Sequence, residues 1–175
     1  YSLFIIFFPQ LIAGPIVKYN HMMPQFNDEK NRVINRQNLN LGLVLILIGL
    51  FKKIFLADNL AIIVDSGFSN YQNLEFFGSW LTSLCFTFQI YFDFSGYIDM
   101  ATGIALLFNI RLPVNFNSPY KATGIISFWQ KWHITLANFL TNYIYFPWVK
   151  SLKKVNFLNI MIIIFFVFVI AGIWH

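Results

Sequence analysis

The chain has 175 residues, of which 58% are hydrophobic, 20% are aromatic and only 11% are charged. An average soluble domain is about 25% charged, so this composition excludes an ordinary water-soluble domain and indicates an integral membrane protein. The net charge of +5 is not accompanied by a basic stripe or an RNA-binding signature, which argues against a nucleic-acid partner. The single cysteine, Cys85, lies in an apolar run and is predicted to pack as a small hydrophobic side chain.

The first part of the chain reads as an interrupted apolar segment followed by a polar one. Residues 1–17 carry no charge but contain Pro9 and Pro15. Proline disrupts a helix interior, so we predict a broken or re-entrant segment that other protein shields from lipid. Residues 18–38 are polar and predict a loop, in which His21 is interpreted as a solvated side chain.

The middle of the chain holds three apolar runs of different lengths. Leu39–Phe51 has 13 residues and is followed by two lysines, which predicts a short or interfacial helix. Phe76–Phe92 has 17 uncharged residues and is predicted to span the membrane. Met100–Ile110 is helix-like and is predicted to end at the Arg-Leu-Pro sequence that follows it.

The last third of the chain ends in the longest apolar run. Residues 113–120 predict extended or turning chain because proline disfavours helix at the residue before it. Ser127–Tyr145 predicts one aromatic, partly amphipathic helix. Phe157–Trp174 has 18 residues, which at about 1.5 Å per residue is just enough to cross a hydrocarbon core of roughly 30 Å.

These elements predict an all-α, polytopic transmembrane protein with short, broken and interfacial helices. We predict a single transmembrane region over residues 1–175. The chain begins without an initiator methionine and stops at a histidine directly after an apolar run. It is therefore predicted to be the central fragment of a longer protein.

Two histidines are the strongest candidates for chemistry. His175 ends the last apolar run, and an ionisable side chain at membrane depth is costly enough to mark a functional site by default. His133 lies in a tryptophan-rich segment. From these features alone the alternatives stay open: His175 as an interfacial residue that stops a helix, and His133 as a residue packed among tryptophans. No local metal-binding motif is present in the sequence, so no metal site is predicted.

Two acidic residues, Asp93 and Asp99, follow the run Phe76–Phe92. Six residues correspond to about 240° of helical rotation, so the two carboxylates do not share one face and do not predict a paired-carboxylate site. We expect a salt bridge or hydrogen bond to a neighbouring helix instead. Gly96, between them, predicts either a close helix contact or a break.

Residue chemistry alone leaves more than one function class open. Broken apolar segments, intramembrane acids and a membrane-depth histidine occur in transporters and channels as well as in membrane-bound enzymes. A purely structural membrane subunit would explain the hydrophobicity but not the pairing of tryptophan with histidine.

Five blocks of this sequence, in order along the chain, resemble the bacterial membrane-bound O-acyltransferases (the MBOAT family). The resemblance is strongest to the alginate O-acetylation branch, with the D-alanyl teichoic-acid transferases as near relatives. The blocks are residues 8–16, 91–100, 115–120, 128–136 and 172–175. The chain departs from the pattern at Gln130-Lys131, where many members have two arginines, and at Thr135, where serine is frequent.

The resemblance implies roles for individual residues. His175 corresponds to the active-site histidine that follows a tryptophan at the end of a hydrophobic helix. His133 corresponds to the second family histidine, which would line the donor path, orient the acyl carrier or assist proton transfer. Further substrate-path candidates are Trp129, Trp132, Trp174, Asp93, Asp99, Asn115 and Tyr120.

The resemblance also implies a reaction and a location. The complete protein is expected to be an acyltransferase, most simply an O-acetyltransferase, of the bacterial cytoplasmic (inner) membrane with several passes. The acyl group would come from a cytoplasmic thioester, either acyl-CoA such as acetyl-CoA or an acyl carrier, which is a donor substrate and not a bound cofactor. Its partners would be membrane lipid and an acceptor protein or cell-surface polysaccharide outside the cytoplasm. The fragment alone is expected to be inactive, and alginate, another exopolysaccharide, peptidoglycan and teichoic acid all remain possible acceptors.

The basic residues predict an orientation in the membrane. Lysine and arginine number four in residues 18–38, two in residues 52–75 and six in residues 93–156. If the two apolar runs between these stretches both cross, the positive-inside rule places the first and third stretches in the cytoplasm. His175 would then be carried outward, and residue 153 would be reachable only from the cytoplasm. If Leu39–Phe51 lies in the interface instead, the first two stretches share a side and the orientation of the last run is unchanged.

Overall fold

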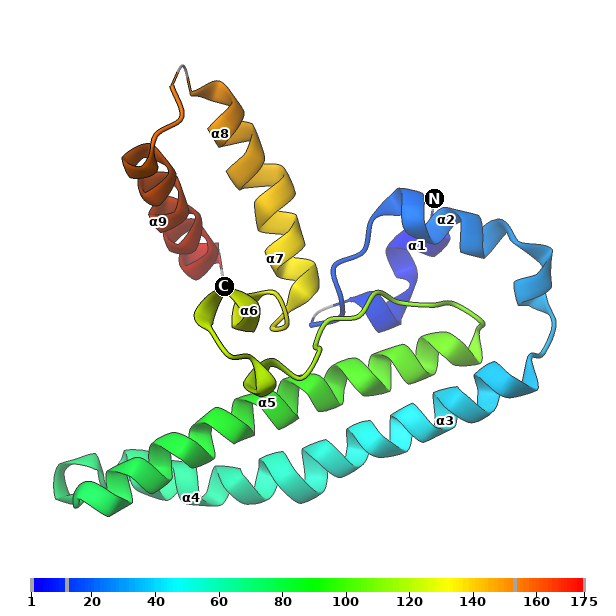
Figure 1. Cartoon of the computed structure of the whole chain (residues 1–175). Coiled ribbons are helices and arrows are strands. Elements are labelled where there is room, and N and C mark those ends of the chain that lie inside the picture. Colours follow the sequence, from blue (N-terminus) through cyan, green and yellow to red (C-terminus); the bar gives the residue numbers. More distant parts are fainter. Residues whose placement is uncertain (1, 12, 153, 175) are drawn as a thin grey trace. The chain divides into compact units, whose positions relative to one another are not determined.

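The computed structural model of the chain describes residues 2–11, 13–152 and 154–174. Within these ranges every regular element is a helix, which confirms the predicted all-α class (Figure 1). The predicted single region of 175 residues contains two compact units, residues 1–113 and residues 114–175. Each unit is described by itself.

The N-terminal segment is broken, as predicted. α1 (Ser2–Ile6) and the 3-10 helix η1 (Phe8–Gln10) are short, and among the described residues no further helix begins before α2 (Tyr19–Asn27). The following segment is more ordered than the predicted loop, because it holds α2 and the 3-10 helix η2 (Glu29–Arg32). His21 is exposed on α2, in agreement with its interpretation as a solvated side chain. A small apolar core of the first unit consists of Phe7, Met22, Ala105, Ile110 and Leu112.

The predicted 13-residue helix is wrong in length. α3 (Arg36–Phe51) passes through the π-helical segment η3 (Lys52–Ala57) directly into α4 (Asp58–Ser69). The result is one helical run of 34 residues that is long and apolar enough to cross a membrane. The two lysines do not end the helix because the ammonium group of each contacts a carboxylate of the neighbouring helix, α5.

α5 (Phe76–Leu107) is a 32-residue helix that runs back along α3 and α4 (Figure 1). It joins the predicted span Phe76–Phe92 and most of the later helix-like run into one element. Two helices of the described residues meet the length and hydropathy requirement for spanning, and α5 is not one of them, so the predicted crossing by α5 stays a prediction. The helix ends earlier than predicted because Asn109 adopts a left-handed conformation with φ of 58°. The Asn109 amide donates to the carbonyls of Asn31 and Val33, which ties the end of α5 to the chain before α3.

Two pairs of glycines bring the backbones of α3 and α5 into direct contact. A Cβ atom placed on Gly49 would lie 2.5 Å from the carbonyl oxygen of Gly96. A Cβ atom on Gly103 would lie 2.5 Å from the carbonyl oxygen of Gly42. Gly96 therefore makes a close helix contact, the first of the two predicted alternatives.

Within residues 114–152 and 154–174, the second unit contains four α-helices and two other helical segments. The predicted single helix Ser127–Tyr145 is wrong: the chain leaves the helical conformation after Trp129 and resumes it at Ile134, because His133 is left-handed. Residues 113–120 are mostly non-helical, as predicted. The helical segments are η5 (Pro119–Lys121), α6 (Ile125–Trp129), α7 (Ile134–Leu140), the π-helical η6 (Thr141–Tyr145), α8 (Phe146–Ser151) and α9 (Phe157–Trp174).

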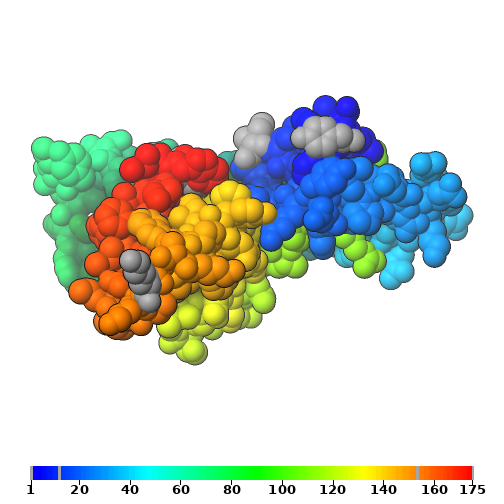
Figure 2. Space-filling model, turned by 90° about the horizontal axis from the view of Figure 1, so that it is seen from above, coloured from blue at the N-terminus to red at the C-terminus, as the bar shows by residue number. Residues whose placement is uncertain are grey.

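α9 coincides with the predicted final apolar run and is the second helix able to cross a membrane by length and composition. It packs against the segment formed by η6 and α8, and the two lie side by side in red and in yellow to orange (Figure 2).

Candidate functional site

His133 occupies the break between α6 and α7. It is the N-cap residue of α7 and has φ of 43° and ψ of 54°, a left-handed conformation that few non-glycine residues adopt. The segment 115–117 lies against this break. The backbone N–H of Ile134 donates to the carbonyl of Asn115 at 2.9 Å, and the N–H of Asn117 donates to the carbonyl of Lys131 at 3.0 Å. These two bonds hold the histidine-bearing turn in place from outside its own helix.

The side chain of Asn115 is the centre of a polar cluster, which we call the Asn115 cluster and which consists of Asn115, His133 and Thr135. Asn115 is 1% exposed. Its Oδ1 atom lies 3.0 Å from His133 Nδ1, 2.9 Å from Thr135 Oγ1 and 3.1 Å from the backbone nitrogen of Thr135. One buried oxygen therefore joins the histidine to the first turn of α7.

Aromatic rings cover one side of the histidine-bearing turn. The Trp132 ring stacks on Phe128 with a centroid distance of 5.7 Å and meets Phe116 edge-on at 5.1 Å. Tyr120 lies 6.1 Å from Trp132, and Phe116 lies 6.4 Å from the His133 ring. Of the predicted substrate-path residues, the structure thus brings Asn115, Tyr120 and Trp132 together around His133.

Trp129 extends this cluster of rings towards α9, because its ring meets that of Phe128 edge-on at 5.4 Å. Trp129 packs edge-on against Phe168 of α9 at 5.6 Å. Trp174 is the last residue of α9 and is 66% exposed. His175 follows it and lies outside the described residues.

Asp93 and Asp99 form ion pairs with the helix that runs beside α5. Lys52 Nζ lies 2.6 Å from Asp99 Oδ2. Lys53 Nζ lies 2.7 Å from Asp93 Oδ1 and 2.9 Å from Asp58 Oδ1. The predicted salt bridge to a neighbouring helix is confirmed for both acids. A further role for them on a substrate path is a prediction that these contacts do not test.

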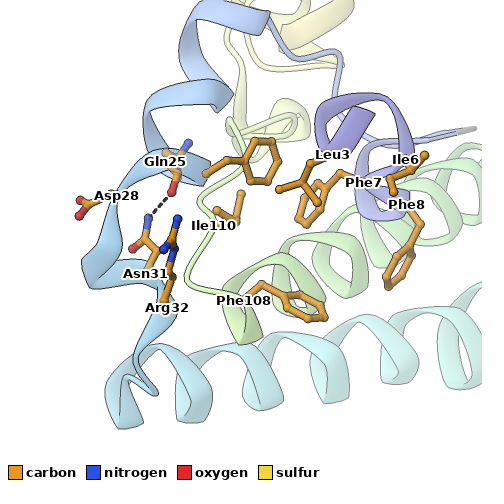
Figure 3. A pocket seen from close by; sticks show the side chains of 11 residues that line it. Leu3, Ile6, Phe7, Phe8, Gln25, Asp28, Asn31, Arg32, Phe108 and Ile110 are labelled. Atoms are coloured by element: carbon orange, nitrogen blue, oxygen red, sulfur yellow. Dashed lines mark hydrogen bonds between the residues drawn. The ribbon is translucent and has the colours of Figure 1, made fainter. Parts of the chain in front are cut away.

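The first unit also contains a cavity of about 320 Å³ (Figure 3). Its lining combines apolar side chains with a polar edge, where the Asn31 amide donates to the main-chain oxygen of Gln25 at 2.8 Å. None of the predicted site residues that the structure describes lines it. The lining residues are Leu3, Ile6, Phe7, Phe8, Gln25, Phe26, Asp28, Asn31, Arg32, Phe108 and Ile110.

Sequence reasoning named His133 and Asn115 but missed how Thr135 takes part. Thr135 is buried and gives Asn115 both its hydroxyl and its backbone N–H. A hydroxyl residue two positions after a histidine was the available signal. In the part of the chain that the structure describes, no group of three or more histidine, cysteine, aspartate or glutamate side chains could hold a metal ion.

Long apolar helices, ion pairs between neighbouring helices and a histidine fixed at a helix break are features of a helical membrane protein with a polar site. Comparison with known proteins makes the class specific. The family model of the membrane-bound O-acyltransferases (MBOAT) matches residues 1–175. The chain belongs to this family, as the resemblance predicted.

Three relatives show how similarity is distributed within the family. A peptidoglycan O-acetyltransferase of Helicobacter pylori is 54% identical over 175 residues, which is all of this chain and 33% of that protein. A probable alginate O-acetylase AlgI of Pseudomonas putida is 37% identical over all of this chain and 35% of its own length. A teichoic acid D-alanyltransferase of Bacillus subtilis is 26% identical over 98% of this chain and 45% of its own length. The chain therefore spans about a third of the length of the first two relatives.

Proposed function

We propose that the complete protein containing this chain transfers an acyl group, most simply acetyl, to hydroxyl groups of a polysaccharide outside the cytoplasm. The observation that carries the proposal is the match of the whole chain to relatives named for O-acetyl or D-alanyl transfer. The 54% identical relative is named for peptidoglycan, so peptidoglycan is the first acceptor to test.

The proposed reaction moves an acyl group from sulfur to oxygen. A base removes the proton of an acceptor hydroxyl as its oxygen attacks the thioester carbonyl. The carbon–sulfur bond then breaks, and the leaving sulfur takes the proton back from the base, so that the donor departs as a free thiol. A neutral histidine can accept the hydroxyl proton, and burial favours the neutral form because it disfavours the imidazolium. We assign the base to His175, and we place His133 on the donor path, where it orients the acyl carrier or assists proton transfer.

A transporter or channel was the alternative that residue chemistry left open. Membership of the MBOAT family and the names of the relatives support acyl transfer and give transport no support. The Asn115 cluster favours the same choice, because it holds a histidine in one orientation, which proton transfer requires.

A membrane assay of the complete protein tests this function. Membranes containing the protein are incubated with radiolabelled acetyl-CoA, with acetylated acyl carrier or with a D-alanylated carrier. Peptidoglycan, alginate and teichoic acid are then examined separately for label in ester linkage. Label on peptidoglycan from acetyl-CoA would support both the transfer of acetyl groups and peptidoglycan as the acceptor. Absence of label on every glycan with every donor would contradict acyl transfer to a polysaccharide.

His133→Ala is expected to lower transfer in this assay by about 10²-fold, the lower end of what a proton-transferring group contributes. The residue is proposed to lie on the substrate path, so a residual rate is expected. The measurement is the initial rate per unit of protein in the membrane. His21→Ala is the matched control, because His21 is exposed and outside the Asn115 cluster. A His133→Ala protein that accumulates normally and transfers at the wild-type rate would remove His133 from the reaction.

We propose an inner-membrane topology from the helices now defined. If the run Arg36–Ser69 and α5 each cross once, the turn Asn70–Glu75 lies on the opposite side from residues 18–35 and 108–156. This turn has no lysine or arginine, whereas the other two stretches have three and six. The positive-inside rule then places the turn outside and α9 with its start in the cytoplasm.

Single-cysteine labelling in a Cys85→Ala background tests this topology. Residue 153, which is predicted to face the cytoplasm, lies outside the described residues, so the cysteine is placed at the neighbouring residue 154. Lys154→Cys is expected to react with a membrane-impermeant maleimide only after the cytoplasmic side of the membrane has been made accessible. Gln72→Cys is expected to react in intact spheroplasts. External labelling of residue 154 would contradict the arrangement.

A further inference from the structure

The orientation of the Asn115 amide follows from its contacts. The backbone nitrogen of Thr135 lies 3.1 Å from the Asn115 atom at the centre of the cluster and can only donate a hydrogen bond. That central atom is therefore the carbonyl oxygen Oδ1 and not the amide nitrogen. Because a carbonyl oxygen can only accept, every other polar group within hydrogen-bond distance of Oδ1 must be the donor.

The protonation of His133 follows in turn. His133 Nδ1 lies 3.0 Å from the same oxygen, which has no hydrogen to give. Nδ1 must therefore be the nitrogen that bears the proton, and in the neutral ring the lone pair that accepts a proton is on Nε2. The Thr135 hydroxyl, 2.9 Å from the oxygen, holds the acceptor in place from the other side.

The amide nitrogen of Asn115 indicates which part of the side chain is needed at this position. Asn115 Nδ2 is buried and has no hydrogen-bond partner among the described residues, while Oδ1 has three. A buried donor without a partner is costly, so the acceptor oxygen is what this position supplies. An amide oxygen orients the ring without adding a negative charge, and it does not stabilise the imidazolium as a carboxylate would.

We infer that Asn115 is a positioning residue for His133, whose carboxamide oxygen fixes the histidine proton on Nδ1 and leaves Nε2 as the proton acceptor. The consequence for acyl transfer rests on the proposed function. The orientation of the ring and its protonation do not.

The test compares three variants of the complete protein in membranes. Asn115→Leu removes the acceptor oxygen and is expected to lower transfer about 10- to 100-fold, which is no more than the loss of about 10²-fold expected for His133→Ala. Asn115→Asp keeps an acceptor of nearly the same shape but adds a negative charge beside His133. It is expected to move the acid limb of the pH–rate profile to higher pH by about one unit or more, because an adjacent opposite charge favours the imidazolium. Thr135→Val removes only the hydroxyl from the Asn115 cluster and is expected to leave the limb where it is.

A second measurement reads the ring directly. Diethyl pyrocarbonate reacts with neutral imidazole, and the modification of the His133 peptide against pH can be followed by mass spectrometry. The midpoint is expected to shift upward in Asn115→Asp and to stay unchanged in Thr135→Val. If Asn115→Leu does not accumulate, the near-isosteric Asn115→Asp still decides the question.

The outcomes separate the two ideas. One outcome is that transfer depends on His133, while in Asn115→Asp both the acid limb of the pH–rate profile and the midpoint of diethyl pyrocarbonate modification stay at the wild-type values. That outcome would overturn the positioning role of Asn115 and leave the proposed function intact. A shifted modification midpoint without transfer to any acceptor would support the positioning role and contradict the proposed function.

Discussion

Replacing His175 with alanine in the complete protein is expected to reduce acyl transfer by about 10²–10⁴-fold, the usual contribution of a general base. Removal of the proposed base leaves the acceptor hydroxyl protonated, and a neutral hydroxyl attacks a thioester slowly. The measurement is transfer of labelled acetyl groups to glycan, normalised to the protein present in the membrane. Insertion is expected to be unaffected, because the 18 residues of α9 precede His175 and carry the apolar character.

His175→Gln serves as a further control, since glutamine keeps a polar side chain of similar length but cannot act as a base near neutral pH. It is expected to be as inactive as the alanine variant. Wild-type transfer by either variant would remove His175 from the role of base and return it to the alternative of an interfacial residue.

Alanine at Gly49 together with alanine at Gly103 is expected to disrupt the packing of α3 on α5. Each new methyl group would lie 2.5 Å from a backbone carbonyl oxygen of the facing helix, and backbone cannot move aside as a flexible side chain can. Overpacking of this kind costs about 1–3 kcal/mol at a single site, so the double variant is expected to lose more than either single one. The measurement is the thermal unfolding midpoint of the purified complete protein in detergent.

Gly172→Ala in α9 is the matched control, because nothing lies within 4 Å of a Cβ atom placed there. It is expected to unfold at the wild-type temperature. A double variant as stable as this control would show that the two helices are not held as closely as the glycine contacts indicate.

The parts of the fold that were predictable are those governed by local sequence. α9 is uniformly apolar and matches its predicted limits, and the two early prolines break the N-terminal segment as expected. The length of the helix through Lys52 and Lys53 was not predictable in this way. Two consecutive lysines after an apolar run predict the end of a helix. Their carboxylate partners lie on α5, about 40 residues later in the sequence, and local sequence does not reveal them.

The candidate site was predictable in its residues but not in its geometry. His133 and Asn115 were named from the family resemblance, but propensity predicts an uninterrupted helix through residue 133. The break depends on hydrogen bonds from a segment about 18 residues earlier, and no local pattern reports such contacts. Likewise the acids at 93 and 99 do not share a helix face, but two consecutive lysines on the neighbouring helix reach both.

The helical run Arg36–Ser69 is also longer than the membrane is thick. At about 1.5 Å per residue its 34 residues extend about 51 Å, against roughly 30 Å of hydrocarbon. Tilt alone would have to exceed 50° to hide that difference, beyond the range of about 0–40° found for transmembrane helices. If the run crosses the membrane, one or both of its ends therefore lie beyond the lipid tails, and Lys52 and Lys53, at the midpoint of the run, lie within the hydrocarbon layer. Lipid tails offer no hydrogen-bond partner to the half-exposed Lys53 and Asp58, so in that arrangement this side of the helix faces protein or water.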